Sequence, residues 1–208
     1  MILLQHIFLG FVIGFVGVIP PGLLNLTAAK IRIAKSLKSA LFFISGACLI
    51  VIGQVYIGVF FSKLIIENDE VLSIMEQLSI VIFLLVSIFY FIKAIKFKGT
   101  LEPKVLVKTE GFKMIGQGML LSLLNIFPIP FYIGFSSFLA GRGLFIYQFP
   151  EAHLFITGAV MGTFLMMFLY VRYIKELGFD SEKFQKSTNY LIAFLTLFIA
   201  LFTAIKTF

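Results

Sequence analysis

The stretch that decides the fold of this chain is GFVIGFVGVIPPG, residues 10–22, and a second stretch of the same kind, GMLLSLLNIFPIP, occupies residues 118–130. Both are apolar, and both end in two closely spaced prolines. Proline has no N–H and clashes with the preceding turn, so a helix is expected to kink or unwind at each place. In hydrocarbon the carbonyl groups released by such a break must be satisfied by protein or by water in a cavity. The carbonyl groups expected to lose their helical donors are those near Val16 and Gly17 and those of Leu124 and Ile126.

The two stretches also indicate an internal repeat. A shift of 108 residues aligns Gly10 with Gly118, Gly14 with Ser122, and Pro20 with Pro128. Each stretch lies in the first of three apolar segments. A repeat with an odd number of spans must insert its second copy upside down. We therefore expect an all-α integral membrane protein with six transmembrane helices in two inverted three-helix repeats, the first and fourth helices being broken at prolines.

The six segments follow from length and hydropathy, because crossing a bilayer takes about 20 apolar residues. The predicted spans are 2–29, 40–61 and 71–95 in a first repeat (1–98), then, after a cytoplasmic linker (99–111), 112–140, 152–171 and 188–205 in a second repeat (112–208). The composition agrees: 60% of the 208 residues are hydrophobic, 13% are charged, and the mean hydropathy is +1.07. A soluble domain of this size needs more polar side chains to cover its surface.

The charge pattern predicts an orientation. Of the 17 Lys and Arg residues, 14 lie in the first, third and fifth loops. Because positive loops stay cytoplasmic, we expect a multi-pass protein of the bacterial cytoplasmic (inner) membrane with both termini outside. The same pattern accounts for the net charge of +7 without nucleic acid as a partner. The lipid bilayer and a small-molecule substrate are the expected partners, and the apolar surface is also compatible with a homodimer.

The breaks are where binding chemistry is expected. Each starts a new helix, whose amides, such as those of Gly22, Leu23 and Leu24, favour a carboxylate. Asn25 and Asn125 can donate to and accept from a zwitterion. Gln54 either lines the pathway or joins neighbouring helices as a polar contact, and the prolines alone can also produce purely structural kinks. The candidate substrate-binding residues are Pro20, Pro21, Gly22, Asn25, Gln54, Asn125, Pro128 and Pro130.

Other chemistry has little support in the sequence. The predicted spans contain no Asp, Lys or Arg in their interiors, the one cysteine (Cys48) cannot pair within the chain, and the two histidines stand apart. Carboxylate or imidazole clusters mark metal sites, proton relays and intramembrane proteases. We therefore predict no enzyme activity, no cofactor and no metal site.

The chain resembles the LysE/RhtB family of amino-acid exporters. The stretch Gly10–Asn25 with its Pro-Pro-Gly is similar to the Pro-Gly-Pro region of that family, the glycine-bearing segment Gly46–Gly53 follows in the same order, and Leu123–Pro128 looks like its Leu-Asn-Pro region. The resemblance implies export of amino acids through the cytoplasmic membrane, commonly coupled to the proton gradient. By position, Pro20, Pro21, Gly22 and Asn25 match the first motif, and Asn125 and Pro128 match the second.

Two departures bear on what the resemblance implies. Pro-Gly-Pro has become Pro20-Pro21-Gly22, and the family's Gly-Asp has become Gly53-Gln54, which removes the acid. Coupling and a preference for cationic substrates therefore lose support. The sequence predicts a secondary transporter that exports amino acids or related small metabolites by alternating access. The alternatives are an exporter of a metal ion or other inorganic solute, and a non-transporting assembly or scaffold protein.

Overall fold

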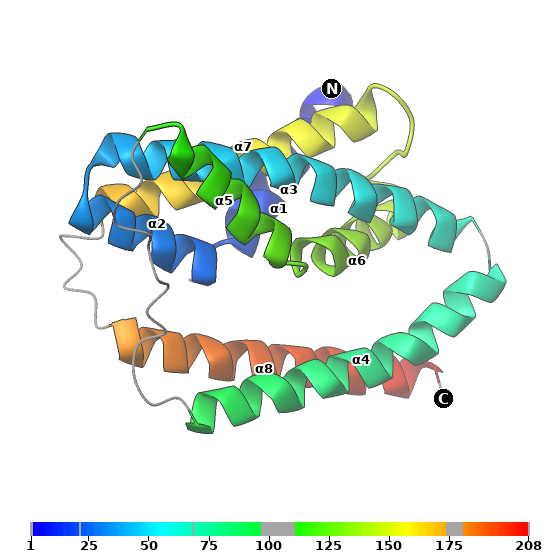
Figure 1. The fold of residues 1–208 in the computed structure, drawn as a ribbon. Coiled ribbons are helices and arrows are strands. Elements are labelled where there is room, and N and C mark those ends of the chain that lie inside the picture. Colours follow the sequence, from blue (N-terminus) through cyan, green and yellow to red (C-terminus); the bar gives the residue numbers. More distant parts are fainter. Residues whose placement is uncertain (1, 21, 68, 97–110, 174–180, 208) are drawn as a thin grey trace. The chain divides into compact units, whose positions relative to one another are not determined.

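The computed structural model describes residues 2–20, 22–67, 69–96, 111–173 and 181–207, and all regular structure in these ranges is helical (Figure 1). The predicted all-α class is confirmed for this part of the chain. The helices are α1 (Ile2–Gly17), α2 (Leu23–Ala34), α3 (Leu37–Ile66), α4 (Asp69–Lys96), α5 (Lys113–Leu124), α6 (Pro128–Gly141), α7 (Glu151–Tyr173) and α8 (Ser181–Thr207).

Within the described residues, α3 and α7 are each long and apolar enough to cross a membrane. The pair α5 and α6, bent by 65° at its break, makes a third span if it is counted as one. The helix α1 is apolar but shorter, at 16 residues. Six spans remain a prediction beyond these two or three.

The chain divides into two compact units, Met1–Lys63 with Glu102–Gly178, and Leu64–Leu101 with Phe179–Phe208. Each unit draws on both halves of the sequence, so the compact units do not coincide with the two predicted repeats. The predicted linker (99–111) lies outside the described residues except for Gly111. The division into repeats therefore stays a prediction.

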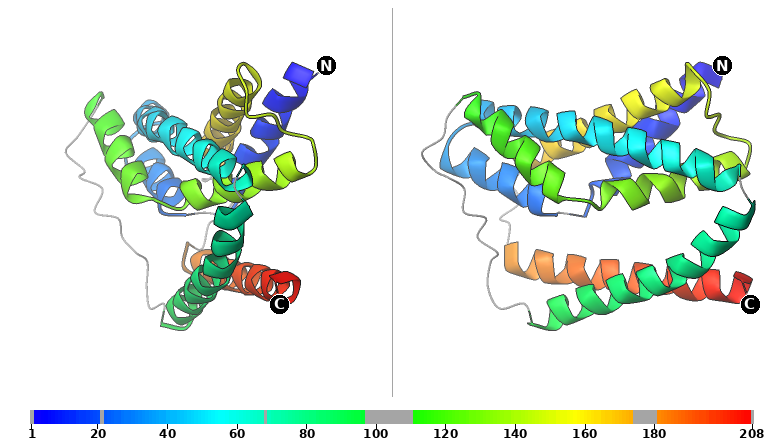
Figure 2. Two further views of the ribbon diagram at one scale, coloured as in Figure 1. Left: turned by 90° about the vertical axis from the view of Figure 1, so that its right-hand side faces the viewer. Right: turned by 45° about the vertical axis from the view of Figure 1, so that its right-hand side comes forward.

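The second unit is a pair of antiparallel helices, α4 and α8, which lie side by side in both views of Figure 2. The Ser87 hydroxyl donates to the carbonyl of Ala193 at 2.9 Å, and this bond joins the two helices in their buried seam. The ring of Phe91 packs edge-on against those of Tyr190 and Phe194. A polar contact and edge-to-face aromatic contacts thus hold a helix pair that also carries large exposed apolar side chains.

The first unit contains a close crossing of α1 and α7. A Cβ added to Gly10 would lie 2.0 Å from the carbonyl oxygen of Phe155, and one added to Gly14 would lie 2.0 Å from that of Ala159. Small residues four apart let two helix backbones touch, which is how apolar helices associate without a hydrophobic driving force. The contact is reciprocal, because Gly158 and Gly162 of α7 lie against the carbonyls of Ile7 and Phe11 of α1, respectively.

The crossing of α3 and α5 repeats this contact. A Cβ on Gly118 would lie 2.0 Å from the carbonyl oxygen of Phe43, and one on Gly46 would lie 2.0 Å from that of Ile115. The 108-residue shift that relates Gly10 to Gly118 also relates Ile7, which meets Gly158, to Ile115, which meets Gly46. Each half-helix before a break therefore crosses a long helix from the other half of the sequence, at equivalent positions.

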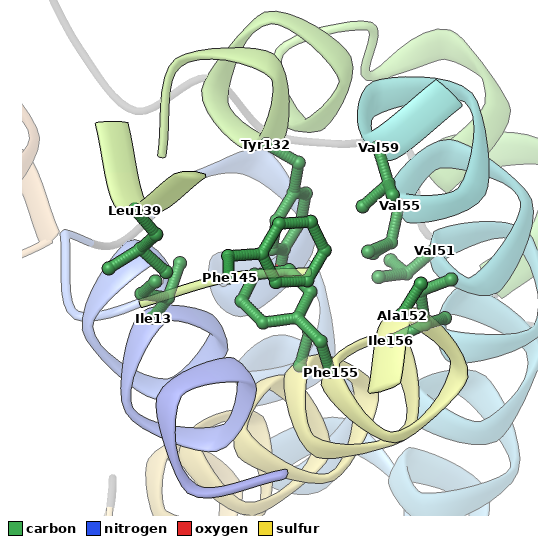
Figure 3. Packing of buried hydrophobic residues seen from close by; sticks show 11 residues of the cluster. Ile13, Val51, Val55, Val59, Tyr132, Leu139, Phe145, Ala152, Phe155 and Ile156 are labelled. Carbon is green, nitrogen blue, oxygen red and sulfur yellow. The ribbon is translucent and has the colours of Figure 1, made fainter. Parts of the chain in front are cut away.

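Beside these crossings lies an aromatic and aliphatic core (Figure 3). Phe155 of α7 and Phe145 of the preceding loop pack ring to ring at 4.8 Å between centroids, and Tyr132 of α6 points into the same space. The α3 side chains Val51, Val55 and Val59 close the opposite side, as Figure 3 shows. This core places the start of α6 against both α3 and α7.

The glycine contact between α5 and α3 can be tested by adding one methyl group. Gly118→Ala should lower the free energy of unfolding by about 1–3 kcal/mol, because its Cβ meets backbone that cannot move aside. The matched control is Gly116→Ala on the same helix, where an added Cβ meets nothing within 4 Å; it should be neutral or stabilising by up to about 1 kcal/mol. Denaturant unfolding in detergent measures both, and equal effects of the two changes would contradict the contact.

Candidate functional site

The first break separates α1 from α2. Before the prolines the chain tightens: the N–H of Val18 donates to the carbonyl of Phe15 at 3.3 Å, and that of Ile19 donates to Val16 at 3.1 Å. The Val16 carbonyl loses its α-helical donor, as expected because Pro20 has no N–H, but it still has a donor, because a three-residue turn replaces the four-residue one. Pro20 lies half-buried in the break, and Pro21 lies outside the described residues.

The carbonyls that the first break does release are bonded by side chains. Gly14 loses the α-helical donor of Val18, and its carbonyl accepts a long hydrogen bond, 3.4 Å, from the hydroxyl of Thr163 on α7. The hydroxyl of Tyr170 on the same helix donates to the carbonyl of Ile19. The long helix that crosses α1 thus supplies donors to its unwound end.

Asn25 serves the same purpose from within α2. Its side chain is buried, and its amide nitrogen donates to the carbonyl of Val18 at 2.8 Å. The amide nitrogen of Asn25, which the sequence analysis expected to bind the substrate, is therefore hydrogen-bonded to the backbone. Just before it, Gly22 is exposed and acts as the N-cap of α2 without any side-chain capping bond, and an added Cβ there meets nothing within 4 Å. The amides that start α2 lie next to open space.

The second break separates α5 from α6. Pro128 is the first residue of α6 and Pro130 its third, positions where the backbone N–H has no helical acceptor in any case. These prolines begin a helix rather than interrupt one. Ile126 loses its α-helical donor, as expected because Pro130 has no N–H, and the N–H of Ile129 donates to that carbonyl instead at 3.1 Å in the first turn.

Gln54 bridges the end of α5 from the crossing helix α3. It is buried, and its amide nitrogen donates to the carbonyls of Ser122 at 3.0 Å and Asn125 at 2.8 Å. The structure thus brings Gln54 and Asn125 together as the sequence analysis grouped them. Gln54 joins two helices through its nitrogen, while its Oε1 has no hydrogen-bond partner among the described residues.

The capping bonds at the two breaks are related in the same way as the glycine contacts. Gly14 and Ser122 correspond under the shift of 108 residues, and each carbonyl accepts a bond from a side chain of the crossing long helix. Thr163 supplies the donor in one case and Gln54 in the other. Ser122 was not among the predicted site residues; the available signal was a hydroxyl in an apolar helix at the position aligned with Gly14.

The two breaks approach each other through α6. A Cβ on Gly17, the last residue of α1, would lie 2.6 Å from the ring of Phe131 in the first turn of α6. The side chain of the next residue, Tyr132, lies beside that of Thr163, which itself bonds the carbonyl of Gly14. No hydrogen bond joins Asn25 to Gln54 or Asn125 in the described part of the chain. The residues of the two breaks are connected through Phe131, Tyr132 and Thr163.

In the described residues, no histidine side chain is hydrogen-bonded to the residues of the two breaks. The described residues contain no group of three or more His, Cys, Asp or Glu side chains placed to bind a metal ion. His6 is buried at the start of α1, where one ring nitrogen donates to the carbonyl of Ile2 and the other accepts from the N–H of Ile146. Its ring anchors the loop before α7 and takes no part in the breaks.

The role of Asn25 in the break can be tested by removing its donor. Asn25→Leu should lower the free energy of unfolding by about 1–3 kcal/mol, because the Val18 carbonyl would be left without a donor in an apolar interior. The matched control is Thr27→Val, an equally buried site whose hydroxyl donates to the carbonyl of Leu23. That carbonyl keeps its helical N–H donor, so we expect a loss below about 1 kcal/mol. Equal losses in a denaturant titration would refute the capping role.

Comparisons with known proteins identify the chain. Neither the curated proteins nor the solved structures contain a match to it. The family model of the LysE type translocator matches residues 15–207, which covers the end of α1, both breaks and every helix from α2 to α8. Members of that family are membrane transporters, and the resemblance seen in the sequence is confirmed. The chain belongs to the family of LysE type translocators.

Proposed function

We propose that this translocator is a secondary transporter that exports amino acids or related small metabolites across the bacterial cytoplasmic membrane by alternating access. The observation that carries the proposal is the pair of broken helices whose released carbonyls are bonded by polar side chains of the crossing helices. Irregular backbone at membrane depth is tolerated where it is buried in protein or lines a cavity, and transporters place their substrate sites there.

The proposed architecture is six spans in two inverted repeats of three, residues 1–98 and 112–208. The reciprocal glycine contacts support it, because α1 crosses α7 as α5 crosses α3, at positions related by one shift. A chance similarity of apolar segments would not reproduce both the crossing residues and the capped carbonyls. Three spans per repeat turn the second copy over, and six spans put both termini on the same side of the membrane. The basic loops favour the outside for the termini.

The proposed site lies where the two breaks meet. The substrate carboxylate faces the first amides of α2 at Gly22, an exposed N-terminus beside open space. Gln54 and Asn125 contact its polar atoms from the end of α5. Asn25 shapes the first break through its bond to Val18, and Pro20, Pro21, Pro128 and Pro130 set where the half-helices end and begin.

Movement in this proposal occurs at the glycine crossings. Backbone-to-backbone contacts carry no interlocking side chains, so α1 can tilt on α7 and α5 on α3 while the helices stay in touch. The hydroxyl of Thr163 and the amide of Gln54 hold the two breaks through single side chains. Alternating access then consists of opening one break while the other stays closed.

Export is tested by loading cells with dipeptides, which are hydrolysed inside, and measuring the amino acids that appear outside with and without the protein. Faster efflux of particular amino acids is expected. Asn125→Ala should slow it about tenfold, the loss of one hydrogen bond to a charged group. The side chain of Asn125 has no hydrogen-bond partner among the described residues, so the variant should fold normally.

The control for this experiment is Thr157→Ala, an exposed α7 residue that bonds only its own helix at His153; it should export like the parent. All variants are compared at equal amounts in the membrane. Unchanged efflux across a broad amino-acid panel would refute amino-acid export and favour an inorganic solute or a scaffold role. Normal efflux by Asn125→Ala would remove Asn125 from the site.

A further inference from the structure

Two buried polar atoms at the end of α5 have no hydrogen-bond partner among the described residues. They are Oε1 of Gln54 and Oγ of Ser122, whose side chains are 5% and 0% exposed. The two residues touch, because the Gln54 amide nitrogen lies 3.0 Å from the Ser122 carbonyl oxygen. A buried polar atom without a partner costs free energy, more so in apolar surroundings. Two such atoms on two contacting residues indicate that something else bonds to them during the working cycle.

The geometry fixes what Gln54 offers. Its amide nitrogen is held between two backbone carbonyl oxygens, those of Ser122 and Asn125. Carbonyl oxygens only accept, so the nitrogen must face them and the amide cannot turn round. The remaining atom, Oε1, is therefore held in place as a hydrogen-bond acceptor that has no donor among the described residues.

Ser122 differs from the other hydroxyl-bearing residues of these helices. Thr27, Ser136, Thr157 and Thr196 each donate to the carbonyl four residues earlier in their own helix. This local bond is the usual way to satisfy a hydroxyl in an apolar helix. The Ser122 hydroxyl makes no such bond to the described chain, so its lone pairs are available to a ligand.

The local charge favours a positive ligand. Ser122 and Asn125 stand at the C-terminal end of α5, which is the negative end of the helix dipole. We propose that Gln54 Oε1 and Ser122 Oγ form the subsite for a primary ammonium group of the transported solute. The proposal rests on the export function above and adds to it the class of substrate, a primary amine, and one residue, Ser122. An ammonium group supplies several N–H donors, whereas two oxygens form only a small part of the shell that an alkali cation requires.

The subsite can be tested without transport, using methylammonium and the purified full chain in detergent. At about ten times its Kd, methylammonium should raise the Tm by ~3 °C. Sodium, potassium and tetramethylammonium at the same ionic strength should not, because none of them donates an N–H. No rise with methylammonium, or an equal rise with any of the three other cations, overturns the proposal.

Two serine variants locate the binding. Ser122→Ala should keep the Tm of the parent in the absence of amine, because the hydroxyl it removes is unpaired, and should bind methylammonium about tenfold more weakly. Ser136→Ala is the matched control, a serine of the same unit that is equally buried and bonds its own helix; its methylammonium affinity should match the parent. Undiminished binding by Ser122→Ala overturns the subsite.

The outcome for the subsite is separable from that for export. Methylammonium binding that depends on Ser122, together with no amino-acid efflux from dipeptide-loaded cells, refutes amino-acid export and leaves the amine subsite standing. Efflux of amino acids without methylammonium binding keeps the export function and refutes the subsite. Where both are positive, Ser122→Ala should also slow efflux, and the exported panel should consist of primary amines.

Discussion

The structure depends on one constraint: a carbonyl group released from a helix in apolar surroundings must find another donor. Two helices of this chain end in mid-course, at Gly17 and Leu124, and each end releases carbonyls from the helical pattern. Some of these carbonyls accept from backbone N–H groups in three-residue turns. Others accept from side chains, chiefly Thr163 and Gln54 on the helices that cross these ends, with Asn25 acting from the next half-helix. A break of this kind is stable only together with its crossing helix, so the fold and the site share the same bonds.

The glycine crossings allow this arrangement. The side chains of Thr163 and Gln54 reach a neighbouring backbone because the helices lie very close, and the glycines at Gly10 and Gly118 remove the atoms that would hold them apart. Close approach, in turn, brings backbone against backbone at both crossings. The movement proposed for transport takes place at these two contacts.

The ends of α1 and α5 correspond under the shift of 108 residues but differ in chemistry. Thr163 gives the first break a hydroxyl that bonds the carbonyl of Gly14. Gln54 gives the second break an amide whose oxygen has no partner among the described residues, and the hydroxyl of Ser122 there is also unpaired. The two breaks therefore carry different polar groups, and these two unpaired oxygens belong to the second break. The proposed amine subsite accounts for that difference, since a structural contact alone would need no spare oxygen.

The sequence by itself determined the helical class, the family and the approximate limits of the helices. The segment predicted at 152–171 is found at Glu151–Tyr173, and the one at 112–140 is found as two helices that part just before Pro128. Hydropathy and proline act locally, through the length of an apolar run and one missing N–H, so they can be read from neighbouring residues. Only the tertiary structure decided which helices cross and which carbonyl each polar side chain bonds. Gln54 reaches a residue 68 positions away, and Ser122 becomes notable only because its hydroxyl is left unpaired. Such pairings depend on the packing of segments distant in sequence, and no local pattern encodes them.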